Sequence, residues 1–182
     1  MVYYHCSPTA GLAVLEPRKP EHFEKPGRVY MTSLLPMALM YGIRNFEYTY
    51  GYAKDGQIYL DEYFEDALLL YRGKSASVYI CEPEEAENTR IPNEWVSSLP
   101  VKVVEEIRIP DVYEALLEEE RKGTLIIYRF HTLSERKRQW IFEAEKREIL
   151  ENNLQHTPGP RADYMRLHYP DSWRAAEEEL NR

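Results

Sequence analysis

The chain has 182 residues, of which 43% are hydrophobic, so it can bury one substantial core but is short for two full domains. Its formal net charge of −8 would repel a phosphate backbone, which disfavours general nucleic-acid binding. No apolar run approaches the roughly 20 residues that span a bilayer, and the N-terminal residues lack the pattern of a signal peptide. We therefore expect a cytoplasmic protein with no membrane segment.

The first predicted strand ends in two residues with polar side chains. Residues 2–6 form a short β-rich run, and the turn-forming sequence after it brings His5 and Ser7 to the C-terminal end of this strand. A polar, proline-rich stretch over residues 16–27 predicts a surface loop. Residues 28–32 then predict a second strand.

The second strand leads directly into a predicted helix. Ser33 is a suitable N-cap for a helix over residues 34–41. Pro36 is tolerated there because the first-turn amides have no intrahelical partner. Gly42 predicts where the helix ends.

Aromatic side chains alternate along the next segment and predict a β-hairpin. Residues 46–52 place Phe46 and three tyrosines at every second position, and a Lys-Asp-Gly turn leads into a second β-type run over residues 57–60. Asp61 is then predicted to cap a helix that continues through Tyr71.

Two further strands and one helix are predicted in the middle of the chain. Residues 77–81 and 101–109 have the composition of strands. Asp111 and Glu114 form a capping box for the helix that follows, and Gly123 closes this helix.

The C-terminal part is predicted to be mainly helical. After a strand over residues 124–130, Thr132 and Glu135 form a second capping box, which opens a charged helix to about residue 153. The apolar positions of this helix are Trp140, Ile141, Ala144, Ile149 and Leu150. One or two short helices are expected beyond residue 160, packed back through Tyr164, Leu167, Tyr169 and Trp173.

Strands interrupted irregularly by helices predict an α+β fold and disfavour a doubly wound sheet. We expect an α+β domain over residues 1–131 and a helical extension, packed on it, over residues 132–182. The sequence contains no glycine-rich phosphate loop of the Rossmann or P-loop type and no Gly-x-Ser-x-Gly motif.

The cysteines and histidines do not form a metal-binding pattern. Cys6 and Cys81 lie inside apolar, strand-like runs and predict buried free thiols. The five histidines are scattered without the i, i+3 or i, i+4 pairs of a helical metal site. We expect no metal.

Three short motifs resemble the ADP-ribosyltransferase superfamily. His5-Cys6-Ser7 ends the first strand, Gly27-Arg28-Val29-Tyr30 enters the second, and Tyr41 lies on the following helix. In the poly(ADP-ribose) polymerase-like branch, His-Gly-Ser or His-Gly-Thr ends the first conserved strand, a Gly-x-x-Tyr strand follows, and a second tyrosine lies on the next helix. The spacing of the two tyrosines is similar, and the order of elements agrees over about residues 1–130.

The resemblance implies a split β-sheet with flanking helices, and cleavage of the nicotinamide–ribose bond of NAD with transfer of ADP-ribose to an unknown protein or nucleic-acid acceptor. His5 would hydrogen-bond a ribose hydroxyl and Ser7 the nicotinamide carboxamide. Tyr30 and Tyr41 would wall the nicotinamide ring, with Tyr41 stacked on it. Such a site must also stabilise the positive charge of an oxocarbenium-like species.

The family places a glutamate at the start of a late strand. Here the strand over residues 101–109 contains Glu105 and Glu106 near its far end. Period-2 alternation puts these two on opposite faces, so at most one can enter a cleft. Glu105 shares a face with Ile107 and Ile109, and we prefer it as the catalytic carboxylate.

A second alignment points to another branch of the same fold. Residues 95–101 resemble the corresponding stretch of RNA 2′-phosphotransferases, which lack the glutamate and use arginines on NAD. This alternative makes Arg28 and Arg44 candidate contacts for NAD.

Three hypotheses therefore stay open. The chain could be an ADP-ribosyltransferase-like enzyme, or a catalytically degenerate module of the same fold that binds a nucleotide or a protein. It could also be a scaffold without a small-molecule site, in which His5, Tyr30 and Tyr41 would lie far apart or be fully packed.

Overall fold

The computed structural model describes residues 2–19, 26–42 and 48–180. The chain forms two compact units. The first consists of Met1–Phe46, Gly51–Tyr59 and Leu68–Ile126, and the second consists of Glu47–Tyr50, Leu60–Ala67 and Ile127–Arg182. The second unit thus contains two short segments from the middle of the chain, in addition to the C-terminal part that the sequence marks off at residue 132.

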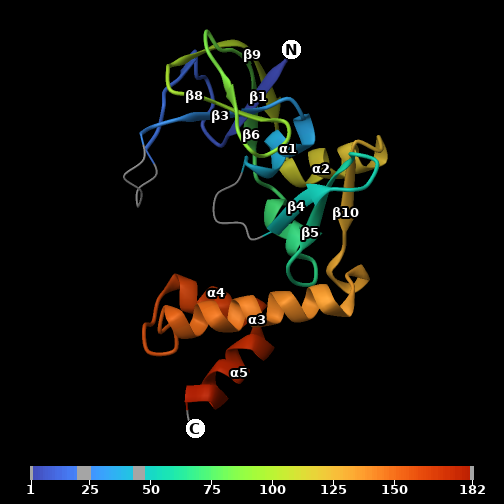
Figure 1. The fold of residues 1–182 in the computed structure, drawn as a ribbon, viewed down its shortest axis with the longest axis vertical. Coiled ribbons are helices and arrows are strands. Elements are labelled where there is room, and N and C mark those ends of the chain that lie inside the picture. Colours follow the sequence, from blue (N-terminus) through green and yellow to red (C-terminus); the bar gives the residue numbers. More distant parts are fainter. Residues whose placement is uncertain (1, 20–25, 43–47, 181–182) are drawn as a thin grey trace. The chain divides into compact units, whose positions relative to one another are not determined.

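Among the described residues, seven strands form one antiparallel sheet with the order β2-β9-β6-β1-β3-β8-β7. Of these, β1, β3, β6, β8 and β9 are labelled in Figure 1. The bounds of the seven strands are Tyr3–Ser7 for β1, Val14–Leu15 for β2, Val29–Thr32 for β3, Ala76–Glu82 for β6, Glu87–Asn88 for β7, Glu94–Ser97 for β8 and Val101–Ile109 for β9. The predicted strands over residues 2–6, 28–32, 77–81 and 101–109 are thereby confirmed, and the chain has an α+β fold.

One face of this sheet carries a buried apolar cluster, against which Leu12 from the chain after β1 packs. The cluster consists of Leu15, Val29, Met31, Tyr79, Cys81 and Val101. The pairs Val29 with Met31 and Tyr79 with Cys81 are each two residues apart, as expected for side chains on one face of a strand. Helix α1 (Leu35–Met40) packs against β1 and β3, and also against α2 (Val112–Arg121).

The start of α1 differs from the prediction. The N-cap is Leu34 and not Ser33. The Ser33 hydroxyl instead donates to Asn93 Oδ1 at 3.1 Å, and Thr32 Oγ1 accepts the Leu34 N–H at 3.1 Å. The predicted end is confirmed, because the Gly42 N–H donates to the Leu39 carbonyl at 3.0 Å.

The predicted hairpin is confirmed, but the helix after it is not. Strands β4 (Tyr48–Tyr52) and β5 (Ile58–Glu62) are neighbours in a second sheet with the order β10-β5-β4, where β10 is Leu125–Tyr128. Asp61 lies inside β5, and only a short 3-10 helix, η1 (Ala67–Tyr71), follows. The buried Asp61 carboxylate accepts the Thr49 hydroxyl and pairs with Lys137, both at 3.0 Å, so it does not cap a helix. Phe46 lies outside the described residues.

Helix α2 begins and ends as predicted. The Asp111 carboxylate accepts the Tyr113 N–H at 2.9 Å and acts as the N-cap. Gly123, at the other end, has a φ of +72°, a left-handed conformation that glycine adopts without steric cost.

In the second unit, the N-cap of α3 (Glu135–Glu151) is Ser134 and not Thr132. Thr132 belongs to the 3-10 helix η2 (Phe130–Thr132), and its hydroxyl donates to the Arg129 carbonyl at 2.7 Å. The expected short helices are present as α4 (Pro160–His168) and α5 (Pro170–Leu180) (Figure 1).

The predicted packing of this unit is confirmed in part. Ile141, Ile149, Tyr169 and Trp173 are buried as expected. Trp140 is half exposed and Leu167 is largely exposed, so these two do not belong to the core. Within the part of the chain that the structure describes, no helix is both long and apolar enough to cross a bilayer.

Candidate functional site

Strand β1 lies between β6 and β3 in the large sheet. Strand β1 pairs with β6 along its full length, but its register with β3 is defined at Tyr4 opposite Thr32 in the described residues. Beyond that point the imidazole of His5 reaches across, and its Nδ1 lies 2.8 Å from the Tyr30 carbonyl oxygen. A carbonyl oxygen only accepts hydrogen bonds, so Nδ1 carries the proton and Nε2 is the acceptor of the neutral ring.

The surroundings of His5 favour this neutral ring. Burial lowers the pKa of His5 below its ordinary value of 6.5. The hydrogen bond to the Tyr30 carbonyl acts in the opposite direction, and the positive charge of Arg18 lowers the pKa further. At neutral pH the ring can therefore accept a hydrogen bond at Nε2.

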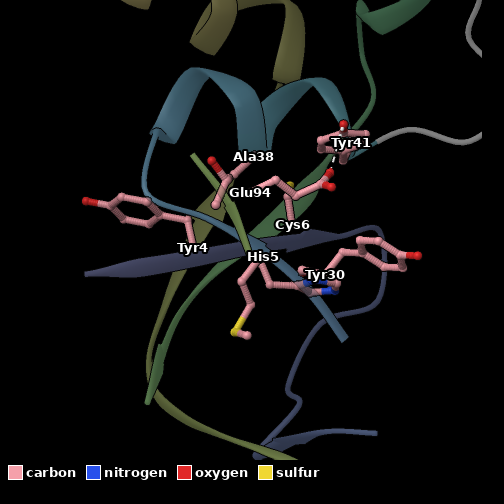
Figure 2. A pocket seen from close by; sticks show the side chains of 9 residues that line it. Tyr4, His5, Cys6, Tyr30, Ala38, Tyr41 and Glu94 are labelled. Atoms are coloured by element: carbon pink, nitrogen blue, oxygen red, sulfur yellow. Dashed lines mark hydrogen bonds between the residues drawn. The ribbon is translucent and has the colours of Figure 1, made fainter. Parts of the chain in front are cut away.

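A cavity of about 330 Å³ opens beside this contact (Figure 2). Its walls are mainly apolar and aromatic and are formed by Tyr4, His5, Cys6, Tyr30, Met31, Thr32, Ala38, Tyr41 and Glu94. Glu94 supplies a carboxylate that is only 7% exposed. It accepts the Thr89 hydroxyl at 2.9 Å and the Tyr41 hydroxyl at 3.5 Å, and Figure 2 shows it directed toward Tyr41.

A second cavity of about 360 Å³ adjoins the first, because His5, Cys6, Tyr30 and Tyr41 line both. The second cavity is more polar. Arg18, Lys19 and Arg28 line it together with one acidic residue, Glu16. An apolar chamber and a basic chamber thus meet at the histidine and the two tyrosines.

The structure brings five predicted site residues together. His5, Ser7, Arg28, Tyr30 and Tyr41 all line the second cavity. Tyr30 is 50% exposed and Tyr41 is 44% exposed, so the two rings are available to a ligand and are not packed in the core. Ser7 is buried, and its hydroxyl accepts the Thr9 N–H at 3.1 Å.

The predicted carboxylate Glu105 is not brought to this place. It is exposed, lies opposite Ile80, and is not among the described residues that line either cavity. Glu106 shares the face of His5 instead, since Tyr79 is the pairing partner of both. The preference for Glu105 over Glu106 is therefore not supported by their positions.

The sequence analysis did not single out Glu94, Arg18 or Lys19. Glu94 is the first residue of β8, and its position opposite Thr32 depends on pairing between distant segments. Arg18 and Lys19 lie in the stretch predicted to be a loop, where Arg18 forms a bridge with Arg28. The available signal was the basic residues at the start of the proline-rich stretch and directly after it. Arg44 lies outside the described residues.

The two cysteines are buried free thiols, as predicted. Burial raises the pKa of each to about 12, so both are protonated at neutral pH and are poor nucleophiles. Although Cys6 lines both cavities, it serves there as a small apolar wall.

No protein-family model matches the chain, and no curated protein matches it. Among the described residues, no group of three or more His, Cys, Asp or Glu side chains could hold a metal ion.

Proposed function

We propose that the protein binds NAD in the cleft between β1 and β3 and cleaves its nicotinamide–ribose bond, passing ADP-ribose to a protein or nucleic-acid acceptor. The observation that carries this proposal is that His5, Ser7, Arg28, Tyr30 and Tyr41 line one cavity. The resemblance to ADP-ribosyltransferases selects the same five residues from the sequence. Each adjoining cavity is also of the size that small-molecule sites usually have.

The half-exposed rings of Tyr30 and Tyr41 suit the nicotinamide. A flat, electron-poor ring stacks favourably on the electron-rich face of a phenol. Because both tyrosines line both cavities, they provide this stacking surface at the place where the chambers meet.

His5 suits the ribose. Its Nδ1–H donates to the Tyr30 carbonyl, and this hydrogen bond orients the ring. Nε2 is then left as an acceptor for a ribose hydroxyl. The lowered pKa of His5 keeps this acceptor in place at neutral pH.

Glu94 is the carboxylate that best suits the bond cleavage. The C–N bond breaks with its electron pair moving to the nicotinamide nitrogen, and positive charge develops on the ribose. The acceptor then forms a bond to the same ribose carbon and loses a proton. A buried carboxylate next to Tyr41 supports this step electrostatically.

A second candidate function is nucleotide binding without turnover. It is favoured by the position of Glu105 away from the cavities and by the engagement of Glu94 with Thr89 and Tyr41. Arg28 in the basic chamber also favours a further alternative, an RNA 2′-phosphotransferase-like enzyme, because such enzymes use arginines on NAD.

Proton NMR of NAD incubated with the protein tests the proposal. We expect free nicotinamide to accumulate with the wild type and not with His5→Ala. The control is His156→Ala, which removes an exposed histidine of the second unit. A rise in melting temperature with NAD but no release of nicotinamide would select the binding module. If NAD changes neither the melting temperature nor the amount of free nicotinamide, both candidates are rejected.

A further inference from the structure

Two arginines lie directly opposite each other beside the basic chamber. The Arg18 N–H donates to the Arg28 carbonyl at 3.3 Å, and the Arg28 N–H donates to the Arg18 carbonyl at 3.2 Å. In an antiparallel bridge that exchanges both hydrogen bonds, the two side chains project to the same side. Like charges in this arrangement repel each other, and an anion bound between the two side chains would offset this repulsion.

A glycine allows the two backbones to approach this closely. A Cβ atom on Gly27 would lie 2.8 Å from the Pro17 carbonyl oxygen, which is closer than side chains allow. Because the opposing atom belongs to the backbone, it cannot rotate away. Glycine is therefore required at position 27 for the close approach that places Arg28 opposite Arg18.

The charge around this bridge is positive, although the whole chain is acidic. Arg18, Lys19 and Arg28 line the second cavity against Glu16 alone, in a protein with a net charge of −8. Arg18 and Lys19 are exposed and Arg28 is half-buried where they line this cavity, so their charges can contact an anion there.

We propose that the basic chamber binds the diphosphate of NAD through Arg18, Lys19 and Arg28, while the nicotinamide ring lies between Tyr30 and Tyr41. This inference rests on the proposed function, since it uses the same cleft, and it deepens it by assigning the diphosphate to the basic chamber. Guanidinium groups bind phosphate oxygens in bidentate geometry, and two of them side by side match the two phosphates of a diphosphate.

The bound anion would also act on His5. Arg18 contributes to the lowered pKa of His5, together with the larger effect of burial. The Tyr79 phenol stacks near the ring, with centroids 6.5 Å apart, and the Tyr30 carbonyl accepts its Nδ1–H; Glu106 is one strand further away. Besides Arg18, the titratable and charged groups among the described residues that line the same cavities as His5 are Glu94, Glu16, Lys19, Arg28, Cys6 and the tyrosines Tyr4, Tyr30 and Tyr41. A diphosphate next to Arg18 would offset the Arg18 charge, so the pKa of His5 should rise when the ligand binds.

Calorimetric titration with ADP-ribose and with adenosine tests the diphosphate site. We expect Arg18→Gln and Arg28→Gln each to weaken ADP-ribose binding about tenfold and to leave adenosine binding unchanged. The matched control is Arg136→Gln, an exposed arginine of the second unit, which should have no effect. Circular dichroism checks that each variant is folded.

Unchanged ADP-ribose affinity in the Arg18→Gln/Arg28→Gln double variant would overturn the inference, as would adenosine binding as tightly as ADP-ribose. A single-stranded RNA that carries a terminal phosphate and binds more tightly than ADP-ribose would also overturn it. NMR titration of His5 is a second readout: ADP-ribose should raise its pKa in the wild type and leave it unchanged in Arg18→Gln.

The two proposals can fail separately. Release of nicotinamide by a protein whose ADP-ribose affinity does not depend on the arginines would reject the diphosphate site alone. Binding of ADP-ribose that depends on both arginines, without nicotinamide release, would reject the proposed catalysis alone.

Discussion

The Glu106 carboxylate accepts the Gly11 backbone N–H with its two oxygens, at 3.1 and 3.2 Å, and so ties β9 to the chain that follows β1. The Ser77 hydroxyl donates to the same carboxylate at 2.6 Å. Next to it, the Tyr79 hydroxyl donates to the Thr9 carbonyl at 2.7 Å. These contacts hold the loop that forms one wall of the basic chamber.

Substitution of Glu106 by Gln should loosen this loop. The Ser77 hydroxyl is the main cause of the lowered pKa of Glu106, with further lowering by the Gly11 N–H and the Arg108 charge. We expect the Gly11 amide to exchange with solvent about tenfold faster, because charge-assisted hydrogen bonds are lost. Glu105→Gln, the exposed neighbour, is the control and should leave the exchange unchanged.

The same carboxylate predicts a pH effect on the loop. The pKa of Glu106 in the folded chain lies below its ordinary value of 4.5, so its contribution to stability is present above pH 4.5. This contribution is lost as the pH falls through the folded-state pKa. Amide exchange of Gly11 should therefore accelerate in acid in the wild type, and a rate independent of pH after correction for intrinsic exchange would contradict this.

His5 should make the stability of the protein depend on pH near neutrality. Because its folded-state pKa is below 6.5, the unfolded chain binds more protons as the pH falls through 6.5. The free energy of unfolding should therefore decrease as the pH is lowered from 7.5 to 5. Urea unfolding at a series of pH values should show a smaller decrease for His5→Gln; equal slopes in both proteins would refute the prediction.

Glu94→Gln tests the carboxylate that we propose supports the bond cleavage. The amide keeps the shape of the side chain but removes the negative charge, so nicotinamide release should fall about 100-fold while ADP-ribose affinity is retained. Glu87→Gln, on the exposed strand β7, is the control. A fall in ADP-ribose affinity without loss of turnover would instead assign Glu94 to binding.

Gly27→Ala tests the close contact behind the arginine bridge. The added methyl group would meet the Pro17 carbonyl, and overpacking of this kind costs about 1–3 kcal/mol of unfolding free energy. Urea unfolding measures this cost against the wild type, and a stability equal to that of the wild type would show that the Gly27 contact is not tight.

The sequence predicted those elements whose signals are local. Alternation predicted β9 (Val101–Ile109), and a capping aspartate followed by a helical pattern predicted α2. The same reasoning failed at Ser33, Asp61 and Thr132, whose side-chain oxygens are potential helix caps. In the folded chain these three oxygens bond to Asn93, to Thr49 and Lys137, and to Arg129.

Part of the candidate site was also predicted from local sequence signals. His5, Ser7, Arg28, Tyr30 and Tyr41 were identified from short motifs, and the fold places all of them at one cavity. Glu105 stays a prediction for the carboxylate; it pairs with Ile80 and does not line this cavity, whereas Glu94 reaches the adjoining cavity through the pairing of β8 with β3.

The sequence by itself thus determined the α+β character, most strand positions and the motif residues of the first half, since periodicity, turns and caps depend on neighbours in the chain. Only the tertiary structure decided that Glu94 faces Tyr41, that Glu106 holds Gly11, and that Arg18 lies opposite Arg28. Each of these contacts depends on strand pairing or loop packing between segments apart in sequence, and that information is not present in any local pattern.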